Sequence, residues 1–140
     1  TLMFGAHAGK RSGQEIELWY KSLVEFVIEN NVKATCVEVD CQKVLGSEAA
    51  WKYRIQMKKD LPNTRQINVF HLDDGKKGLD RMIEFSDYIA VSVPELRAAG
   101  KKNYTSEIAN YIKNKKPSID IHLLGCTEMK LLKQYHYAMP

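Results

Sequence analysis

Short β-branched segments alternate with amphipathic helical segments along the chain, and this alternation constrains the fold more than any other feature. Four segments are short, rich in β-branched or aromatic residues and bounded by turn residues, which predicts strands at 34–39, 67–72, 88–93 and 119–124. Helical periodicity predicts helices at 15–30, 48–59, 78–85, 106–114 and 128–135. Strands and helices that alternate through short connections predict a parallel sheet with right-handed crossovers.

Turn residues fix the ends of three of these helices. Asn30-Asn31, Pro62-Asn63 and Lys116-Pro117 each follow a helical segment and are typical of helix termination. The connections that they begin are short, as repeated βα units require.

The predicted fold class is therefore α/β, built from repeated βα units. Two architectures satisfy the pattern: a doubly wound sheet and part of a (β/α)8 TIM barrel, which normally needs about 250 residues. The chain has 140 residues, and both of its ends look as if an element were cut midway, which favours the barrel. We expect a single α/β domain over residues 1–140 that is truncated at both ends.

Composition excludes several classes of protein. Apolar residues make up 44% and charged residues 27% of the chain, which argues against a disordered tail, a collagen-like repeat or a membrane span. The net charge of +4 permits an anionic partner without requiring one. The three cysteines are odd in number and form no CxxC pair, which predicts neither a disulfide framework nor a zinc ribbon and favours the cytoplasm.

Polar residues follow each predicted strand, at the edge where parallel α/β folds bind ligands. We expect these residues to surround one pocket: Asp40, Cys41, His71, Asp73, Asp74, Ser92, Glu95, Gly125, Cys126 and Glu128.

Most of these candidates also have a purely structural interpretation. Asp40 is compatible with a turn cap and His71 with a buried core histidine. Asp73 and Asp74 are more typical of a solvated turn than of a metal pair. Glu95 is spaced to form a surface ion pair with Arg97.

A glycine-rich loop at 5–13 precedes the first predicted helix, which is where a phosphate-binding loop belongs. Its spacing differs from a Walker A loop, because three residues separate Gly5 from Gly9 and Arg11 follows Lys10. We therefore expect His7, Lys10 and Arg11 to contact nucleic-acid phosphates rather than bind a nucleoside triphosphate.

Further basic residues lie within the predicted helices. They are Lys52, Arg54, Lys58, Lys59, Lys113, Lys115 and Lys116. Such residues usually form solvated helix faces, and the sequence shows no aromatic platform beside them.

Three segments resemble a known family. VEVDCQKVLG at 37–46, the stretch at 65–97 that begins RQINVFHLDDG, and IHLLGCTEMKLLKQYHYAMP at 121–140 are similar to the superfamily that contains the tRNA-guanine transglycosylases. They are closest to its phage and genomic-island branch, which inserts 7-deazaguanine bases into DNA. The chain then corresponds to the middle of a (β/α)8 barrel.

The resemblance implies base exchange, in which an aspartate attacks the sugar carbon, guanine leaves and a 7-deazaguanine replaces it. It implies that Asp40 and Cys41 read the incoming base, that His71 stands where the family commonly has glutamine, and that Leu124 and Gly125 line the base pocket. Ser92 and Val93 occupy a stretch that is a glycine-rich turn in the family.

The resemblance also places essential parts outside the chain. The family's Asp-Ser-Gly motif falls before Thr1, and the nucleophile and any zinc-binding cysteines fall after Pro140. We expect the parent protein to be a glycosyltransferase acting on DNA or tRNA, with no cofactor held within this chain. On its own, the fragment is expected to be inactive. Two alternatives stay open: a barrel enzyme acting on a phosphorylated metabolite, and a non-catalytic nucleic-acid-binding module.

Overall fold

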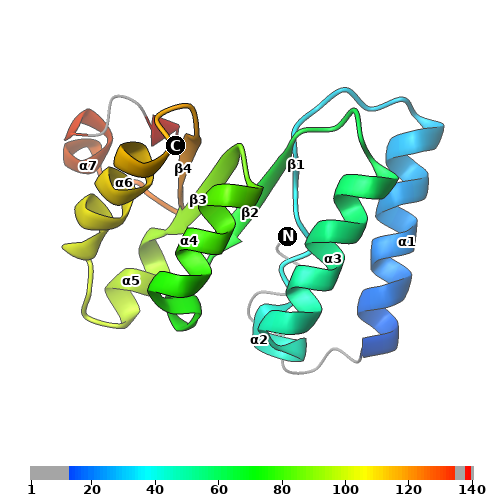
Figure 1. Ribbon diagram of the computed structural model, residues 1–140, viewed down its shortest axis with the longest axis horizontal. Helices are drawn as coiled ribbons and strands as arrows, with labels where there is room; N and C mark the ends of the chain where they lie inside the picture. Colours follow the sequence, from blue (N-terminus) through cyan, green and yellow to red (C-terminus); the bar gives the residue numbers. More distant parts are fainter. Residues whose placement is uncertain (1–12, 135–137, 140) are drawn as a thin grey trace. The chain divides into compact units, whose positions relative to one another are not determined.

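The computed structural model describes residues 13–134, 138 and 139 (Figure 1). By their internal contacts the residues group into two compact units, Thr1–Gln66 and Ile67–Pro140. Each unit is an α/β arrangement and is described by itself. The single domain expected over residues 1–140 stays a prediction.

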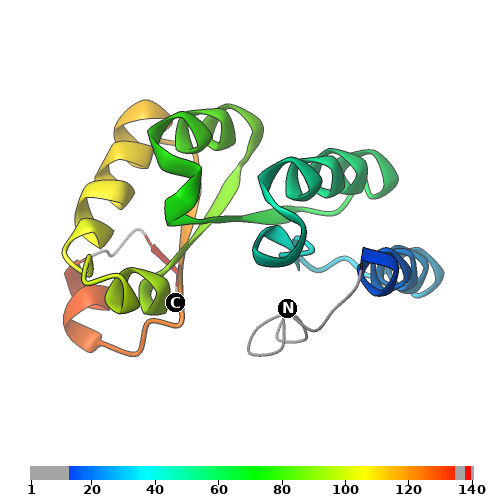
Figure 2. The same cartoon turned by 90° about the horizontal axis from the view of Figure 1, so that it is seen from below.

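The first unit consists of helices around one short strand. Its elements are α1 (Gly13–Glu29), β1 (Cys36–Val37), α2 (Gln42–Leu45) and α3 (Ser47–Asp60). Helices α1 and α3 lie side by side and run in the same direction (Figures 1 and 2). The helices predicted at 15–30 and 48–59 are confirmed.

The strand predicted at 34–39 is much shorter than expected. Only β1 is extended strand, and the Cys36 N–H donates to the Arg65 carbonyl at 2.9 Å. After Val37 the chain leaves the strand, and the side chains of Glu38 and Val39 are both buried.

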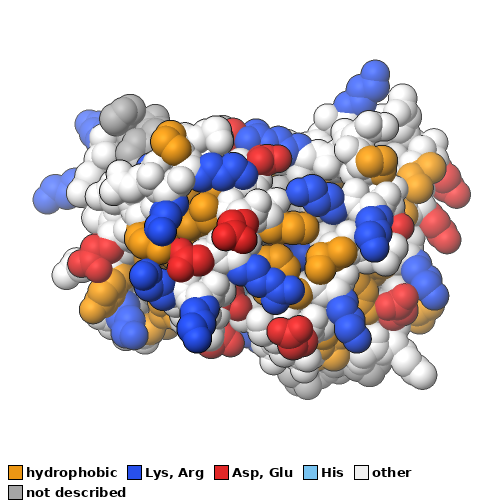
Figure 3. Space-filling view, viewed as in Figure 1, with side chains coloured by type: hydrophobic (Ala, Val, Ile, Leu, Met, Phe, Trp, Pro, Cys, Tyr) orange, Lys and Arg blue, Asp and Glu red, His pale blue; other side chains and the backbone are white. Residues whose placement is uncertain are grey.

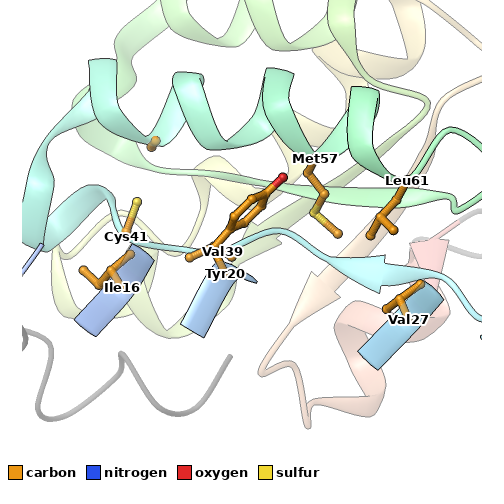
Figure 4. Packing of buried hydrophobic residues seen from close by; sticks show 8 residues of the cluster. Ile16, Tyr20, Val27, Val39, Cys41, Met57 and Leu61 are labelled. Carbon is orange, nitrogen blue, oxygen red and sulfur yellow. The ribbon is translucent and has the colours of Figure 1, made fainter. Parts of the chain in front are cut away.

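Apolar side chains from all parts of the first unit form its core (Figure 4). Helix α1 contributes Ile16, Tyr20 and Val27, at the spacing of one helix face. Side chains from α3 and from the segment after β1 complete it: Val39, Cys41, Ala50, Met57 and Leu61. Tyr20 also donates from its hydroxyl to the Asp60 carboxylate at 2.6 Å, which joins α1 to the end of α3.

A buried ion pair lies within the first unit. Arg54 donates from Nε to Glu38 Oε2 at 2.6 Å and from Nη2 to Glu38 Oε1 at 2.8 Å, and the side chains are 1% and 2% exposed. The guanidinium also lies 4.7 Å from the centre of a Trp51 ring. The expectation that Arg54 belongs to a solvated face is therefore wrong. The Glu38 carboxylate accepts two hydrogen bonds from the guanidinium, and these offset the cost of burying its charge.

The second unit is built on a parallel sheet. Its strands are β2 (Gln66–Phe70), β3 (Tyr88–Ser92), β4 (Asp120–Leu124) and β5 (Ala138–Met139), in the spatial order β2-β3-β4-β5. Its helical segments are η3 (Leu72–Asp74), α4 (Gly75–Phe85), α5 (Val93–Ala98), α6 (Tyr104–Lys115) and α7 (Met129–Gln134). The parallel pairing confirms the predicted βα units.

Helices α4 and α6, which connect β2 to β3 and β3 to β4, lie on the same side of the sheet (Figure 2). Phe70 of β2 and Ile108 and Tyr111 of α6 line one pocket on this side. None of the helices within residues 13–134 combines the length and the apolar run needed to cross a bilayer.

Replacing Arg54 with methionine is expected to destabilise the protein by about 3–5 kcal/mol, because it leaves the Glu38 carboxylate buried without this partner. Urea unfolding followed by circular dichroism measures the change. The double variant Glu38→Met/Arg54→Met should regain most of the loss, since it removes both charges.

The exposed pair of Lys21 and Glu17, 3.8 Å apart, provides the control. Lys21→Met should change the free energy of unfolding by less than about 1 kcal/mol. Equal losses in Lys21→Met and Arg54→Met would contradict the importance given to burial.

Candidate functional site

The register of the sheet brings three of the predicted site residues to one level. Phe70, Val91 and Leu123 are paired across β2, β3 and β4, and Ser92 is paired with Leu124 one residue further on. His71 directly follows Phe70, the last residue of β2, with an extended backbone (φ −111°, ψ 146°), so it continues the strand direction to this level.

Side chains along a strand alternate between the two faces of the sheet. Phe70 faces the helices, as its place in the pocket beside α6 shows. His71, Ser92 and Leu124 are each one residue beyond the row that contains Phe70, and therefore belong to the opposite face. The sheet thus presents an imidazole, a hydroxyl and an apolar side chain together at its carboxyl edge.

A carboxylate holds the imidazole. His71 Nδ1 lies 3.0 Å from Glu95 Oε2, and the side chains of His71 and Glu95 are 4% and 19% exposed. The other oxygen, Oε1, accepts from the backbone N–H of Leu72 at 3.1 Å. Because a carboxylate only accepts, Nδ1 carries the proton in this contact.

Glu95 owes its position to the start of α5. The Ser92 hydroxyl accepts from the Glu95 N–H at 3.3 Å and caps the helix, and a proline stands in the first turn. Ser92 to Glu95 reads S-V-P-E, which is the spacing of a capping box with proline at a favoured position. That signal was available in the sequence, yet α5 and the contact of Glu95 with His71 were not predicted.

The loop after β4 packs against the start of α5. Gly125 has φ +66°, and a Cβ on it would lie 2.6 Å from Pro94 Cγ. Only glycine fits this position without a shift of one loop. Val93, beside Pro94, is fully buried, so its side chain is part of the core of the unit rather than of an open surface.

The expected Glu95–Arg97 ion pair is wrong. Arg97 instead donates to Glu128 at 2.6 Å, and Lys102 donates to the other oxygen of Glu128 at 2.6 Å. The Lys102 hydrogen bond is the main reason why the pKa of Glu128 is lowered. This exposed cluster ties α5 and the loop before α6 to the segment after β4.

The two aspartates after β2 differ in their roles. Asp73 is exposed, while Asp74 Oδ2 accepts from the His71 N–H at 3.1 Å and closes the turn. Within the part of the chain that the structure describes, no three His, Cys, Asp or Glu side chains are grouped so as to hold a metal ion.

Asp40 and Cys41 lie in the first unit, between β1 and α2. The Asp40 side chain is half-buried, and its neighbours Val39 and Cys41 are buried in the core. Burial, together with the nearby charges of Glu38 and Asp40, raises the pKa of the Cys41 thiol to about 11. The thiol is therefore held in its neutral form at neutral pH.

The remaining predicted residues, His7, Lys10 and Arg11, and the rest of the glycine-rich loop before Gly13 lie outside the described residues. Their proposed contacts with phosphates stay a prediction.

Glu95→Ala is expected to lower the free energy of unfolding by about 1–3 kcal/mol, because the Leu72 N–H and the buried His71 ring both lose their acceptor. Glu95→Gln keeps one acceptor oxygen and should lose less. Urea unfolding measures both. Glu84, exposed on α4, is the control, and Glu84→Ala should stay within about 0.5 kcal/mol of the parent.

Cys41 is expected to resist alkylation in the folded protein. Iodoacetamide at pH 8 should label the half-buried Cys126 and leave Cys41 unmodified, because the thiolate is the reactive form and the Cys41 side chain is fully buried. Peptide mass spectrometry measures the extent of labelling, and urea should expose all three thiols. Rapid labelling of Cys41 in the native state would show that its surroundings are open.

The chain was compared with protein families, curated proteins and solved structures. No family model, curated protein or solved structure matches it. The assignment of a function therefore rests on the geometry of these residues and on the segments that resemble the transglycosylases.

Proposed function

We propose that the chain is the base-recognition part of a nucleic-acid transglycosylase that replaces guanine with a 7-deazaguanine in DNA or tRNA. The observation that carries the proposal is the shared level of His71, Ser92 and Leu124 at the carboxyl edge of the sheet. They follow three different strands, and the resemblance implied base contacts at His71 and Leu124 and a glycine-rich turn at Ser92.

The strand order supports the barrel that such an enzyme requires. Right-handed crossovers between strands in the sequential order β2-β3-β4-β5 place every connecting helix on one side of the sheet. A doubly wound sheet reverses its strand order and carries helices on both faces. The common side of α4 and α6 therefore favours part of a (β/α)8 barrel (Figure 2).

In this proposal His71 contacts the base through Nε2. With Nδ1–H bonded to Glu95, Nε2 of the neutral form of the ring would be an acceptor, which suits an N–H of a purine-like base. A glutamine amide at this place offers either a donor or an acceptor. His71 would thus make one of the two contacts available to the family's usual residue, with its ring fixed by Glu95.

The resemblance implies that Asp40, in the first unit, also reads the base. The amidine edge of a deazaguanine presents two N–H groups to one carboxylate, which gives a charge-assisted pair. Two core side chains, Val39 and Cys41, hold the backbone on either side of Asp40. Such anchoring limits the entropy that the carboxylate loses when it binds the base.

The proposed chemistry is the exchange that the resemblance implies. An aspartate of the parent enzyme attacks the sugar carbon, and guanine leaves with a proton taken up on its ring nitrogen; the incoming base then attacks the same carbon, loses its ring N–H proton and displaces the aspartate. The residues of this chain would bind and orient the base for that step. A nucleotide in a duplex or a folded RNA must leave its stack first, as in other enzymes that act on bases.

Asp40→Asn is expected to weaken the binding of a free 7-deazaguanine base at least about tenfold, the equivalent of roughly 1.4 kcal/mol. Asparagine keeps the shape, but its amide group opposes one N–H of the base with another donor. Calorimetric titration measures the affinity, and the melting temperature should change little. Asp87, whose side chain is 74% exposed, is the matched control as Asp87→Asn.

Equal affinity in Asp40→Asn and the parent chain would remove Asp40 from the base site and favour a turn cap. Absence of any binding by the parent chain would contradict the proposed function.

A further inference from the structure

A pocket of about 500 Å³ lies between α4 and α6, on the helix side of the sheet. The face that carries His71 and Ser92 is the opposite one, so this pocket is separate from the candidate base site. Its apolar lining comes from Phe70, Leu72, Leu79 and Ile108. Pockets of this size and character commonly hold small ligands or single groups of larger ones.

Two tyrosines form part of the pocket. Tyr104 is 48% exposed, so much of its ring is open to solvent. Tyr111 donates its hydroxyl to Asp80, and this bond fixes the ring between the two helices. The pocket therefore contains one ring that is held in place and one that is open to solvent.

Lysines accompany both rings. Lys101 Nζ lies 5.9 Å from the Tyr104 ring centre, and Lys76 and Lys115 lie 5.8 and 5.6 Å from that of Tyr111. The acidic side chains nearby are Glu107, which lines the pocket, and Asp80, which is bonded to Tyr111. Figure 3 shows Lys and Arg side chains around apolar ones over this part of the molecule.

The aromatic platform that the sequence did not reveal is therefore present in the structure. Tyr111 lies beside Lys115 on α6, but Lys76 and Lys101 come from other segments of the unit. Lys101 and Lys115 are close to their rings in the sequence, and only the fold brings Lys76 to Tyr111.

We propose that this pocket binds a single nucleic-acid strand, with one base stacked on Tyr104 and the adjacent phosphates held by Lys76 and Lys101. Aromatic rings that stack bases and cations that follow the backbone are the two components of single-strand binding. A flexible lysine that covers a ring in the free protein can turn to a phosphate when a base takes its place. The choice of a strand over a free nucleotide rests on the proposed function, in which the substrate is a nucleic acid.

Fluorescence anisotropy with a labelled 12-nucleotide single strand tests the proposal, with DNA and RNA strands of the same sequence as separate arms. Tyr104→Ala should weaken binding roughly tenfold through the loss of one stack, whereas Tyr104→Phe should bind as the parent does. Lys101→Gln and Lys76→Gln should both weaken binding. Each should also reduce, by about 0.7, the steepness with which the logarithm of the binding constant falls as the logarithm of salt concentration rises. Lys59→Gln, on the exposed face of α3, is the control and should change neither quantity.

Three results would overturn the inference. They are no binding of either strand, equal binding in Tyr104→Ala and the parent chain, and binding of guanosine monophosphate as tight as that of the strand. Melting curves of Tyr104→Ala show whether this variant is folded. Tyr104→Trp enlarges the stacking surface and gives an independent test, because it should bind the strand at least as tightly as the parent does.

Titration with free 7-deazaguanine separates this inference from the proposed function. Strand binding that depends on Tyr104, without any binding of the base, would contradict the base-exchange proposal and leave the strand site in place. Base binding that depends on Asp40, together with strand binding that is unaffected by Tyr104→Ala, would support the base-exchange proposal and contradict the strand site.

Discussion

The in-register parallel pairing of β2, β3 and β4 is the constraint on which the second unit depends. Each pairing fixes which three side chains stand at one level, and alternation then fixes which face they share. A slip of one residue in β3 would exchange Ser92 for Val91 at the level of Leu124 and remove the hydroxyl from the site. The apolar row at Phe70, Val91 and Leu123 resists such a slip because it packs on the helix side.

Each unit contains a buried or half-buried glutamate that is paired with a nitrogen-containing side chain, but the two pairs differ in their surroundings. Glu38 takes two hydrogen bonds from Arg54 in a nearly solvent-free setting, which fixes the segment after β1 to α3. Glu95 divides its oxygens between His71 and a backbone N–H and keeps some contact with solvent. The first pair is suited to holding a fold together, and the second to orienting an imidazole ring.

Periodicity and turn chemistry predicted most of the regular structure, because they depend on local sequence. Helix α1 ends at Glu29, where Asn31 takes a positive φ of 47°, as the Asn-Asn pair indicated. The sequence failed where a distant partner decides the outcome. Arg54 has the polarity of a surface residue until Glu38 and Trp51 surround it, and His71 reveals its environment only once β3 and α5 place Glu95 beside it.

The close contact of Gly125 with Pro94 links two loops mechanically. Gly125 follows β4 and Pro94 opens α5, which carries Glu95. Because there is no room for even one carbon between them, the loop after β4 packs directly against the start of α5. We expect a side chain at position 125 to displace α5, and with it the carboxylate that orients His71.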